Sequence, residues 1–157
     1  MPLPESELDR FFIRISIGYP AREDEKRILR DYVTTTSAES LQPVMTVDDV
    51  LKLQAEAAKV TVEDSVADYV LALVEASRRA PGVDIGVSPR GGLALFRSSQ
   101  ARAMIEGRDY VLPDDVKAMT PHVFLHRMVC RGSRDRGLNG TARRALDEIL
   151  KEVPAPV

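Results

Sequence analysis

Two arginines occupy positions in which a guanidinium could be held against an anion. Arg90 follows Ser88 and Pro89, which are favoured at the N-cap and the first position of a helix, so the spacing predicts a helix that begins at Pro89. A cation in the first turn opposes the helix dipole, and a bound anion or plain solvent exposure would relieve that cost. Arg10 follows Asp9 in the run LPESELDRFF. Each arginine could grip phosphate oxygens with its planar fork, or form an ordinary surface ion pair.

Three further side chains have chemistry of their own. His122 and His126 lie four residues apart, which places both on one face of a helix; the pair could bind a metal, but a pair in the core or on the surface is the simpler interpretation. Cys130 precedes Arg131, which could lower the pKa of the thiol, although a small apolar filler near a helix end is again simpler. Because Cys130 is the only cysteine, no disulfide forms within the chain, and we expect a cytoplasmic protein.

Composition and missing motifs exclude several classes of protein. The chain has 157 residues, of which 44% are hydrophobic and 29% charged, and its net charge of −2 offers no basic field for a nucleic acid. No apolar run reaches membrane-spanning length, so we expect neither nucleic acid nor membrane as a partner. The sequence contains no G-x-x-x-x-G-K-[ST] phosphate loop, no G-x-G-x-x-G and no H-E-x-x-H.

Apolar periodicity predicts a mainly helical chain with one strand. Residues 11–17, FFIRISI, alternate with period two and predict a strand that has no partner in its own chain. We therefore expect residues 1–19 to be disordered or paired with another copy of the chain. Helices are predicted in the charged segment 21–32, after Thr46 with Asp49 in its capping box, after Thr61 with Asp64, from Pro89 to Gly107, from Pro113 with a break or kink at Thr120-Pro121, and from the cap Thr141 to about Glu152.

Two of these stretches resemble the MoxR family of AAA+ ATPases. LPESELDRFFIRISIGYP resembles the family's Leu-Pro-Glu-x-x-Leu-Asp-Arg-Phe segment, and the stretch that begins GVSPRGGLALF resembles its helical lid. The lid motifs are a Ser-Pro-Arg helix start, Glu-Gly-Arg-Asp-Tyr-Val, Pro-Asp-Asp-Val-Lys and a final His-Arg, so the resemblance extends from Leu3 to about Met128. Gly92, where a bulkier helix former is usual, departs from the pattern at a cost of roughly 1 kcal/mol in helix propensity. Leu112 stands where a capping threonine is usual.

The resemblance implies a function and a role for each arginine. Members of the family hydrolyse ATP with Mg²⁺ at the subunit interfaces of a ring, usually a hexamer, and act as chaperones or maturation factors. Their partners often carry von Willebrand factor A domains. Arg10 matches the arginine finger, a catalytic residue that reaches the γ-phosphate in a neighbouring subunit. Arg90 matches the sensor 2 arginine, which contacts the nucleotide of its own or a neighbouring subunit from the lid.

The same resemblance implies a division of the chain. We expect residues 1–20 to be the end of the AAA+ core with its last strand, 21–45 a connecting helix and linker, 46–130 the helical lid, and 131–157 a loop and a C-terminal helix. The family's Walker A and Walker B motifs lie before this segment and are not in the sequence, so we expect the chain to be a C-terminal fragment that binds neither ATP nor Mg²⁺ alone.

The alternative is a free-standing helical module that binds a protein or a nucleic acid. It would use the arginines of the segment 90–108 or the loop CRGSRDRG, which begins at Cys130. Acidic residues lie between these arginines along the sequence, so no continuous basic stripe is predicted. The arginines concerned are Arg90, Arg97, Arg102 and Arg108.

Overall fold

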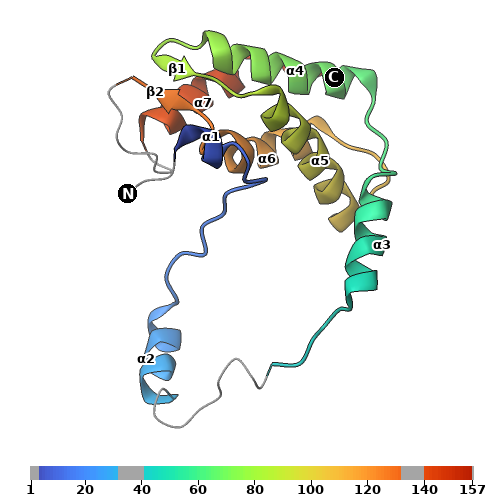
Figure 1. The fold of residues 1–157 in the computed structure, drawn as a ribbon, viewed down its shortest axis with the longest axis vertical. Coiled ribbons are helices and arrows are strands. Elements are labelled where there is room, and N and C mark those ends of the chain that lie inside the picture. Colours follow the sequence, from blue (N-terminus) through green and yellow to red (C-terminus); the bar gives the residue numbers. More distant parts are fainter. Residues whose placement is uncertain (1–3, 32–40, 132–139, 157) are drawn as a thin grey trace.

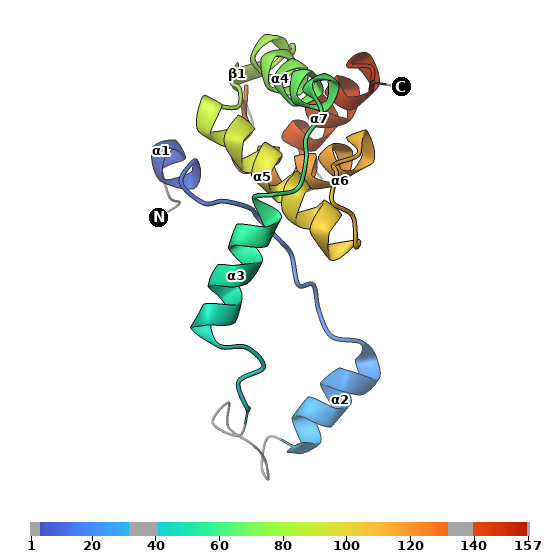
Figure 2. The same cartoon turned by 90° about the vertical axis from the view of Figure 1, so that its right-hand side faces the viewer.

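The computed structural model describes residues 4–31, 41–131 and 140–156, which form helices joined by one small sheet (Figure 1). The segments 64–79, 89–105, 113–124 and 141–152 pack into a bundle, while the helices at 22–31 and 47–57 extend away from it in both views (Figures 1 and 2). This confirms the predicted mainly helical fold. No helix in the described ranges is long and apolar enough to cross a membrane. The elements are α1 (Glu5–Leu8), α2 (Arg22–Asp31), α3 (Val47–Ala57), α4 (Asp64–Arg79), β1 (Val83–Ile85), α5 (Pro89–Ile105), α6 (Pro113–Phe124), β2 (Val129–Cys130) and α7 (Thr141–Glu152).

Two helix starts form as their capping residues predict. Thr46 Oγ1 accepts a hydrogen bond from the backbone N–H of Asp49 at 3.2 Å, and Asp49 Oδ2 accepts one from the N–H of Thr46 at 3.0 Å. This is the predicted capping box, with an aspartate in place of the usual glutamate. At α5, Ser88 Oγ accepts from the N–H of Gly91 at 3.2 Å, and Pro89 occupies the first position. These caps fix where α3 and α5 begin.

Other predicted boundaries are wrong. α4 has Glu63, not Thr61, at its N-cap; the backbone of Thr61 instead bonds to Asp109 O at 2.8 Å and accepts from Val111 N at 2.9 Å. These two bonds join the start of α4 to the segment before α6. α7 begins at Thr141 itself, with Gly140 at the N-cap.

Of the break or kink predicted at Thr120-Pro121, the break is absent, because α6 runs continuously through Pro121. A kink at this position stays a prediction. A proline inside a helix removes one backbone hydrogen bond, but here Val116 and Phe124 are both fully buried on either side of it. Burial of two such side chains contributes roughly 3–6 kcal/mol, about as much as or more than the proline costs. Packing therefore overrides the local signal.

The strand predicted over residues 11–17 does not form. The segment is extended, and the N–H of Arg14 donates to His122 O of α6 at 2.8 Å, but no strand of the described residues lies beside it. Residues 9–14 make hydrogen bonds within their own chain, and the expectation that residues 1–19 are disordered or paired with another copy stays a prediction. Residues 1–3 lie outside the described ranges.

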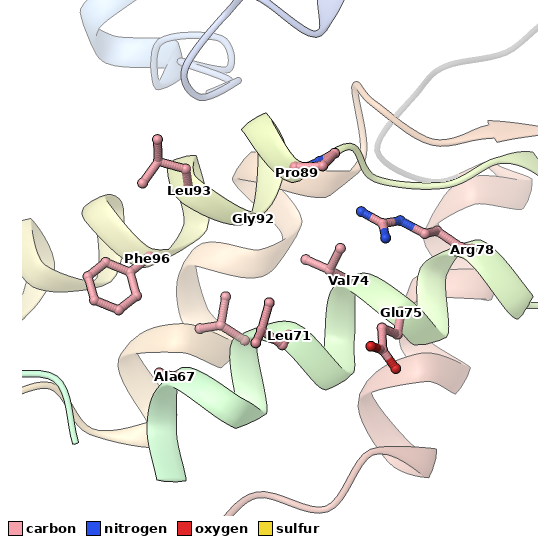
Figure 3. A pocket seen from close by; sticks show the side chains of 10 residues that line it. Ala67, Leu71, Val74, Glu75, Arg78, Pro89, Gly92, Leu93 and Phe96 are labelled. Carbon is pink, nitrogen blue, oxygen red and sulfur yellow. The ribbon is translucent and has the colours of Figure 1, made fainter. Parts of the chain in front are cut away.

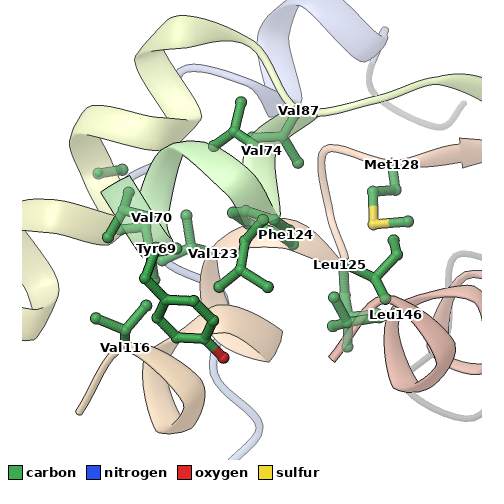
Figure 4. Packing of buried hydrophobic residues seen from close by; sticks show 14 of the residues in the cluster. Tyr69, Val70, Val74, Val87, Val116, Val123, Phe124, Leu125, Met128 and Leu146 are labelled. Carbon is green, nitrogen blue, oxygen red and sulfur yellow. The ribbon is translucent and has the colours of Figure 1, made fainter. Parts of the chain in front are cut away.

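The core lies between α4, α5, α6 and α7 (Figure 4). α4 contributes one apolar face, in which Leu73 is fully buried, and Phe124 of α6 lies at the centre of the view. Leu146 and Ile149 bring α7 into the same core. The face that α5 buries consists mainly of small residues, which lets its neighbours approach closely. The buried residues of α5 are Gly91, Gly92, Ala94, Leu95, Ser98, Ser99, Gln100 and Ala103.

The two short strands close the bundle beside α4. β1 and β2 pair antiparallel, with Val83 opposite Cys130 and Ile85 opposite Val129. Gly86, just after β1, packs against the end of α4, where an added Cβ would lie 2.6 Å from the Cα of Arg78. A side chain at this position would collide with backbone, so the chain can turn from β1 into α5 only with glycine here.

Candidate functional site

The segment that contains Arg10 is tied to the start of α5 by a carboxylate. Asp9 accepts hydrogen bonds from Ser88 Oγ, at 2.9 and 3.0 Å to its two oxygens, and from Arg127 Nε at 3.1 Å. Asp9, Ser88 and Arg127 are called the Arg127 cluster below. It joins three parts of the chain that are up to 118 residues apart, namely the turn after α1, the N-cap of α5 and the end of α6.

Arg127 is the centre of this cluster and is almost completely buried. Its side chain is 2% exposed, and it donates from Nη2 to the carbonyls of Phe11 and Asp9 at 2.6 and 3.1 Å. From Nη1 it donates to Val123 O at 2.6 Å and to Phe12 O at 3.3 Å. Burial lowers the pKa of Arg127, while the charge and hydrogen bond of Asp9 raise it. The guanidinium keeps its charge and fixes the backbone on both sides of Arg10.

Gly91 explains how Arg127 comes so close to α5. A Cβ at position 91 would lie 2.4 Å from Val87 Cγ1 and 2.8 Å from Arg127 Cδ. Real side chains do not approach this closely, so the arginine passes over α5 only because this position has no side chain. Gly92, the departure from the family pattern, faces Val74 of α4, with an added Cβ 3.2 Å from Val74 Cγ2.

The histidine pair contacts the same N-terminal segment. His126 Nε2 lies 3.1 Å from Phe11 O, and His122 Nδ1 lies 3.1 Å from Arg14 O. The two histidines therefore lie on the same side, as predicted, and both contact the extended backbone of residues 11–14. No group of three metal-ligating side chains occurs in the described parts of the chain, so the metal interpretation finds no support there.

Both candidate site arginines are exposed and lie beside the Arg127 cluster. Arg10 is the residue after Asp9; its side chain is 66% exposed and 3.9 Å from Glu7. Arg90 lies two residues after Ser88 and is exposed, and no hydrogen bond or ion pair joins it to another described residue. The positive charge of Arg90 also lowers the pKa of Arg127, but this effect is smaller than those of burial and of Asp9. Arg90 and Arg127 thus place two positive charges near the start of α5, and only Arg127 is paired with a carboxylate, which favours an anion there.

Two of the arginines proposed for nucleic-acid binding are already paired. Asp115, which is 3% exposed, accepts from Arg108 Nη1 and Nη2 at 2.7 Å each, and Arg102 Nε lies 3.3 Å away. Burial alone would raise the pKa of Asp115, but the hydrogen bonds and charges of these partners outweigh it and the pKa lies below its ordinary range. Asp115 also accepts from the N–H of Leu112 at 2.9 Å, which is the half of a capping box that the N3 residue makes, while the leucine at the N-cap has no side-chain acceptor for the other half. These arginines are structural, and most of the loop CRGSRDRG lies outside the described residues.

A hollow of about 490 Å³ lies between α4 and α5 (Figure 3). Its lining is mostly apolar and includes Leu71, Leu93 and Phe96, with Arg78 at the end near Pro89. Arg78 Nε donates to Val87 O at 2.8 Å, so its charge is held by the backbone before α5. Neither candidate site arginine lines this hollow, and phosphate recognition is not its chemistry.

The environment of Cys130 disfavours the thiolate. Cys130 is buried in β2, and burial, with a smaller effect of Asp84, raises the pKa of its thiol. The interpretation as an apolar filler is confirmed, and the one with a lowered pKa is wrong.

Sequence reasoning missed Arg127, the best-connected residue of the site. Its signal was present, since a single arginine in the apolar run VFLHRMVC predicts a buried charge that needs a partner. The identity of that partner was not readable, because Asp9 lies far away in the sequence. Ser88 was predicted only as a helix cap, and its second contact depends on the same long-range docking.

Comparison with known proteins identifies the domain. The model of the AAA lid domain matches residues 75–149. The YeaC protein of Bacillus subtilis is 37% identical over 157 residues, which are 99% of this chain and 48% of YeaC. The chaperone MoxR1 of Mycobacterium tuberculosis is 35% identical over 137 residues, 82% of this chain and 36% of MoxR1. The crystal structure of a candidate ATPase from Cytophaga hutchinsonii superposes with a TM-score of 0.84 at 29% identity, covering 100% of this chain and 50% of that one.

These matches confirm the resemblance to MoxR proteins and the AAA lid within the chain. The chain spans half or less of the length of each of the three proteins. The matches do not test the roles of Arg10 and Arg90 or the proposed division of residues 1–157, which stay predictions.

Proposed function

We propose, for a chain that is related to the MoxR proteins and carries an AAA lid, that it supplies two arginines to ATP bound in a ring-forming AAA+ ATPase. Arg10 acts as the arginine finger and stabilises the charge that develops on the γ-phosphate in a neighbouring subunit. Arg90 acts as sensor 2 and contacts nucleotide phosphate from the lid. The assembled protein works as a chaperone or maturation factor, with client proteins that carry von Willebrand factor A domains among its partners.

One observation supports this proposal above the others. Arg10 and Arg90 are both exposed, and they lie beside the same buried ion pair, one after Asp9 and the other after Ser88. Exposed arginines whose backbones are fixed can bind phosphate with little loss of freedom, whereas paired arginines such as Arg108 cannot.

The two arginines fit ATP, and the described residues hold no donor set for its metal. Arg90 has no carboxylate partner in the described ranges, and the first turn of α5 adds partial positive charge. Mg²⁺ needs oxygen ligands such as carboxylates, and no cluster of three metal-ligating side chains exists among the described residues. In the proposed assembly Mg²⁺ and the phosphate loop come from the AAA+ core, and this chain contributes binding and charge stabilisation.

A chimaera tests both arginines. This chain would replace the matching 137-residue region of Mycobacterium tuberculosis MoxR1, and ATP hydrolysis and ATP affinity would be measured. Arg10→Ala should lower kcat by about 10³-fold with ATP affinity nearly unchanged, because the finger acts on the transition state. Arg90→Ala should weaken ATP binding as well as turnover.

The matched control is Arg97→Ala, which removes an exposed arginine from the same helix. It should leave kcat and affinity within about twofold of the unmodified chimaera. Equal effects of all three substitutions, or full activity of Arg10→Ala, would refute the assigned roles. The 157-residue chain by itself should show no turnover, and hydrolysis by the pure chain would contradict the proposal.

A further inference from the structure

We infer that Arg127 is a positioning residue that makes Arg10 and Arg90 move as one body, through its bonds to Asp9 and to the backbone of the finger segment. The finger segment here means residues 9–14. The inference rests on the proposed function for what the two arginines contact. What it adds is a mechanical link within one subunit, between the residue that reaches a neighbour's nucleotide and the helix that senses nucleotide from the lid.

The donors of Arg127 are almost all used on this segment. Nε binds the carboxylate of Asp9, and Nη2 binds the carbonyls of Asp9 and Phe11. Nη1 reaches Phe12 O and the last turn of α6 at Val123 O. The planar fork therefore contacts the residues on both sides of Arg10 at once. A lysine, with its donors on one nitrogen atom, cannot reproduce this pattern.

The finger segment is held by polar contacts and by partly exposed aromatic side chains. The side chains of Phe11 and Phe12 are 55% and 48% exposed, so apolar packing contributes only part of what full burial would give. The histidine contacts at Phe11 O and Arg14 O attach the segment to α6. The hydrogen bond from Ser88 Oγ to Asp9 joins the segment to the start of α5, and Arg127 orients the carboxylate that accepts it. Phe12 also lines a hollow with Arg97 and Gln100 of α5.

The bundle itself does not depend on this link. Fully buried side chains such as Leu73, Leu95 and Phe124 come from α4, α5 and α6, and none of the side chains described in residues 6–14 is buried. Loss of the Arg127 fork should therefore release the finger segment while the lid stays folded. In the assembled ATPase, a lid rotation sensed through Arg90 would then no longer carry Arg10 with it.

The link can be measured in this chain without nucleotide. Nitroxide labels on Arg10→Cys and Arg90→Cys, in a Cys130→Ala background, give the distance distribution between the two positions by pulsed electron resonance. The native cluster should give one narrow distribution. Arg127→Lys should broaden it by about twofold or more while far-UV circular dichroism stays unchanged, because the charge remains but the fork is lost.

Controls and milder variants keep the result decisive. Asp84→Asn removes a surface ion pair with Arg131 at 3.3 Å and should leave the distribution unchanged. If Arg127→Lys does not fold, Asp9→Asn and Ser88→Ala replace it, since the side chain of Asp9 is 30% exposed and its loss leaves no empty space in the core. A distribution as narrow as the native one in these folded variants would overturn the inference.

Kinetics in the MoxR1 chimaera separate this inference from the proposed function. Arg127→Lys should lower kcat by about tenfold with the KM for ATP within about twofold, since the finger is misplaced and the nucleotide site is not altered. A chimaera in which Arg10→Ala has no effect would refute the proposed function, and the distance measurement would still judge the link. Broadened distances with unchanged kcat would refute the link's role in catalysis.

Discussion

Arg127 carries a full charge where water hardly reaches it, and its neighbours show how this charge is tolerated. Transfer of an ion into a protein interior costs several kcal/mol, and only excellent geometry offsets that cost. Here Asp9 supplies the opposite charge at 3.1 Å, and backbone carbonyls of Asp9, Phe11 and Val123 accept from the remaining donors. The arginine contributes less to net stability than to specificity, because alternative placements of the finger segment would leave it unpaired.

The glycine below this arginine gives a residue-scale prediction. Gly91→Ala should destabilise the chain by about 1–3 kcal/mol, because the new Cβ would lie 2.4 Å from Val87 Cγ1 and 2.8 Å from Arg127 Cδ. The loss comes in spite of a gain of about 1 kcal/mol in helix propensity. The free energy of unfolding of the native chain and of Gly91→Ala is measured by urea unfolding followed by circular dichroism.

The next residue is the matched control. Gly92→Ala gains the same propensity, and its Cβ would meet a single methyl, Val74 Cγ2, at 3.2 Å. The free energy of unfolding of Gly92→Ala should therefore differ from that of the native chain by no more than about 1 kcal/mol. If Gly91→Ala were as stable as Gly92→Ala, the close approach of Arg127 to α5 would be refuted.

His126 gives the chain a pH dependence. Burial lowers its pKa, the bond to Phe11 O partly opposes this, and the charges of Arg127 and Arg14 lower it further, against a smaller opposite effect of Asp9. The folded state thus favours the neutral ring, whereas the unfolded chain binds a proton below about pH 6.5. Stability is complete above that pH and is lost as the pH falls toward the folded-state pKa.

The measurement is the free energy of unfolding in urea at about pH 7.5 and about pH 5.5. The native chain should lose stability between the two values, and His126→Gln should lose less, because it has no proton to take up at this position. Equal losses in both proteins would show that His126 does not contribute.

At the scale of elements, capping residues and apolar periodicity predict the structure correctly where no tertiary contact competes with them. The capping residues Thr46 and Ser88 predict the starts of α3 and α5, and the apolar period of α4 predicts its buried face. The signals fail where tertiary contacts compete. Pro121 lies inside α6 because its neighbours are buried, and Thr61 is drawn into a pairing with Tyr110 instead of capping α4.

The N-terminal segment shows most clearly what one sequence cannot supply. Its period-two pattern predicts a strand, but a strand requires a partner, and the partners of this backbone are the side chains of α6. The resemblance to MoxR proteins identified Arg10 and Arg90 as candidates. It did not indicate that Asp9, Ser88 and Arg127 bring them together, because contacts between distant residues leave no mark in the spacing of either motif.

Stability in the whole molecule is concentrated in the bundle of α4 to α7. The exposed large apolar side chains are concentrated in the N-terminal segment, α2 and α3; Ile17 and Tyr19 are each 95% exposed. Every described side chain of α2 is exposed, and α2 lies apart from the bundle in both views (Figures 1 and 2). The lid should therefore unfold as one unit whose free energy does not depend on α2.

Paired substitutions test this separation. Leu29→Pro, at a residue 77% exposed in α2, costs that helix about 3 kcal/mol or more and should melt it locally. It should leave the global unfolding free energy of the bundle, measured by amide hydrogen exchange in α4 and α5, within about 0.5 kcal/mol of native, since no core contact is lost. Leu73→Ala, at a fully buried residue of α4, should reduce the same quantity by about 2–5 kcal/mol through loss of burial and the cavity left behind. A reduction in bundle stability by Leu29→Pro that approaches that of Leu73→Ala would mean that α2 and the lid unfold together. The finger segment would then be attached to a larger cooperative unit than the bundle.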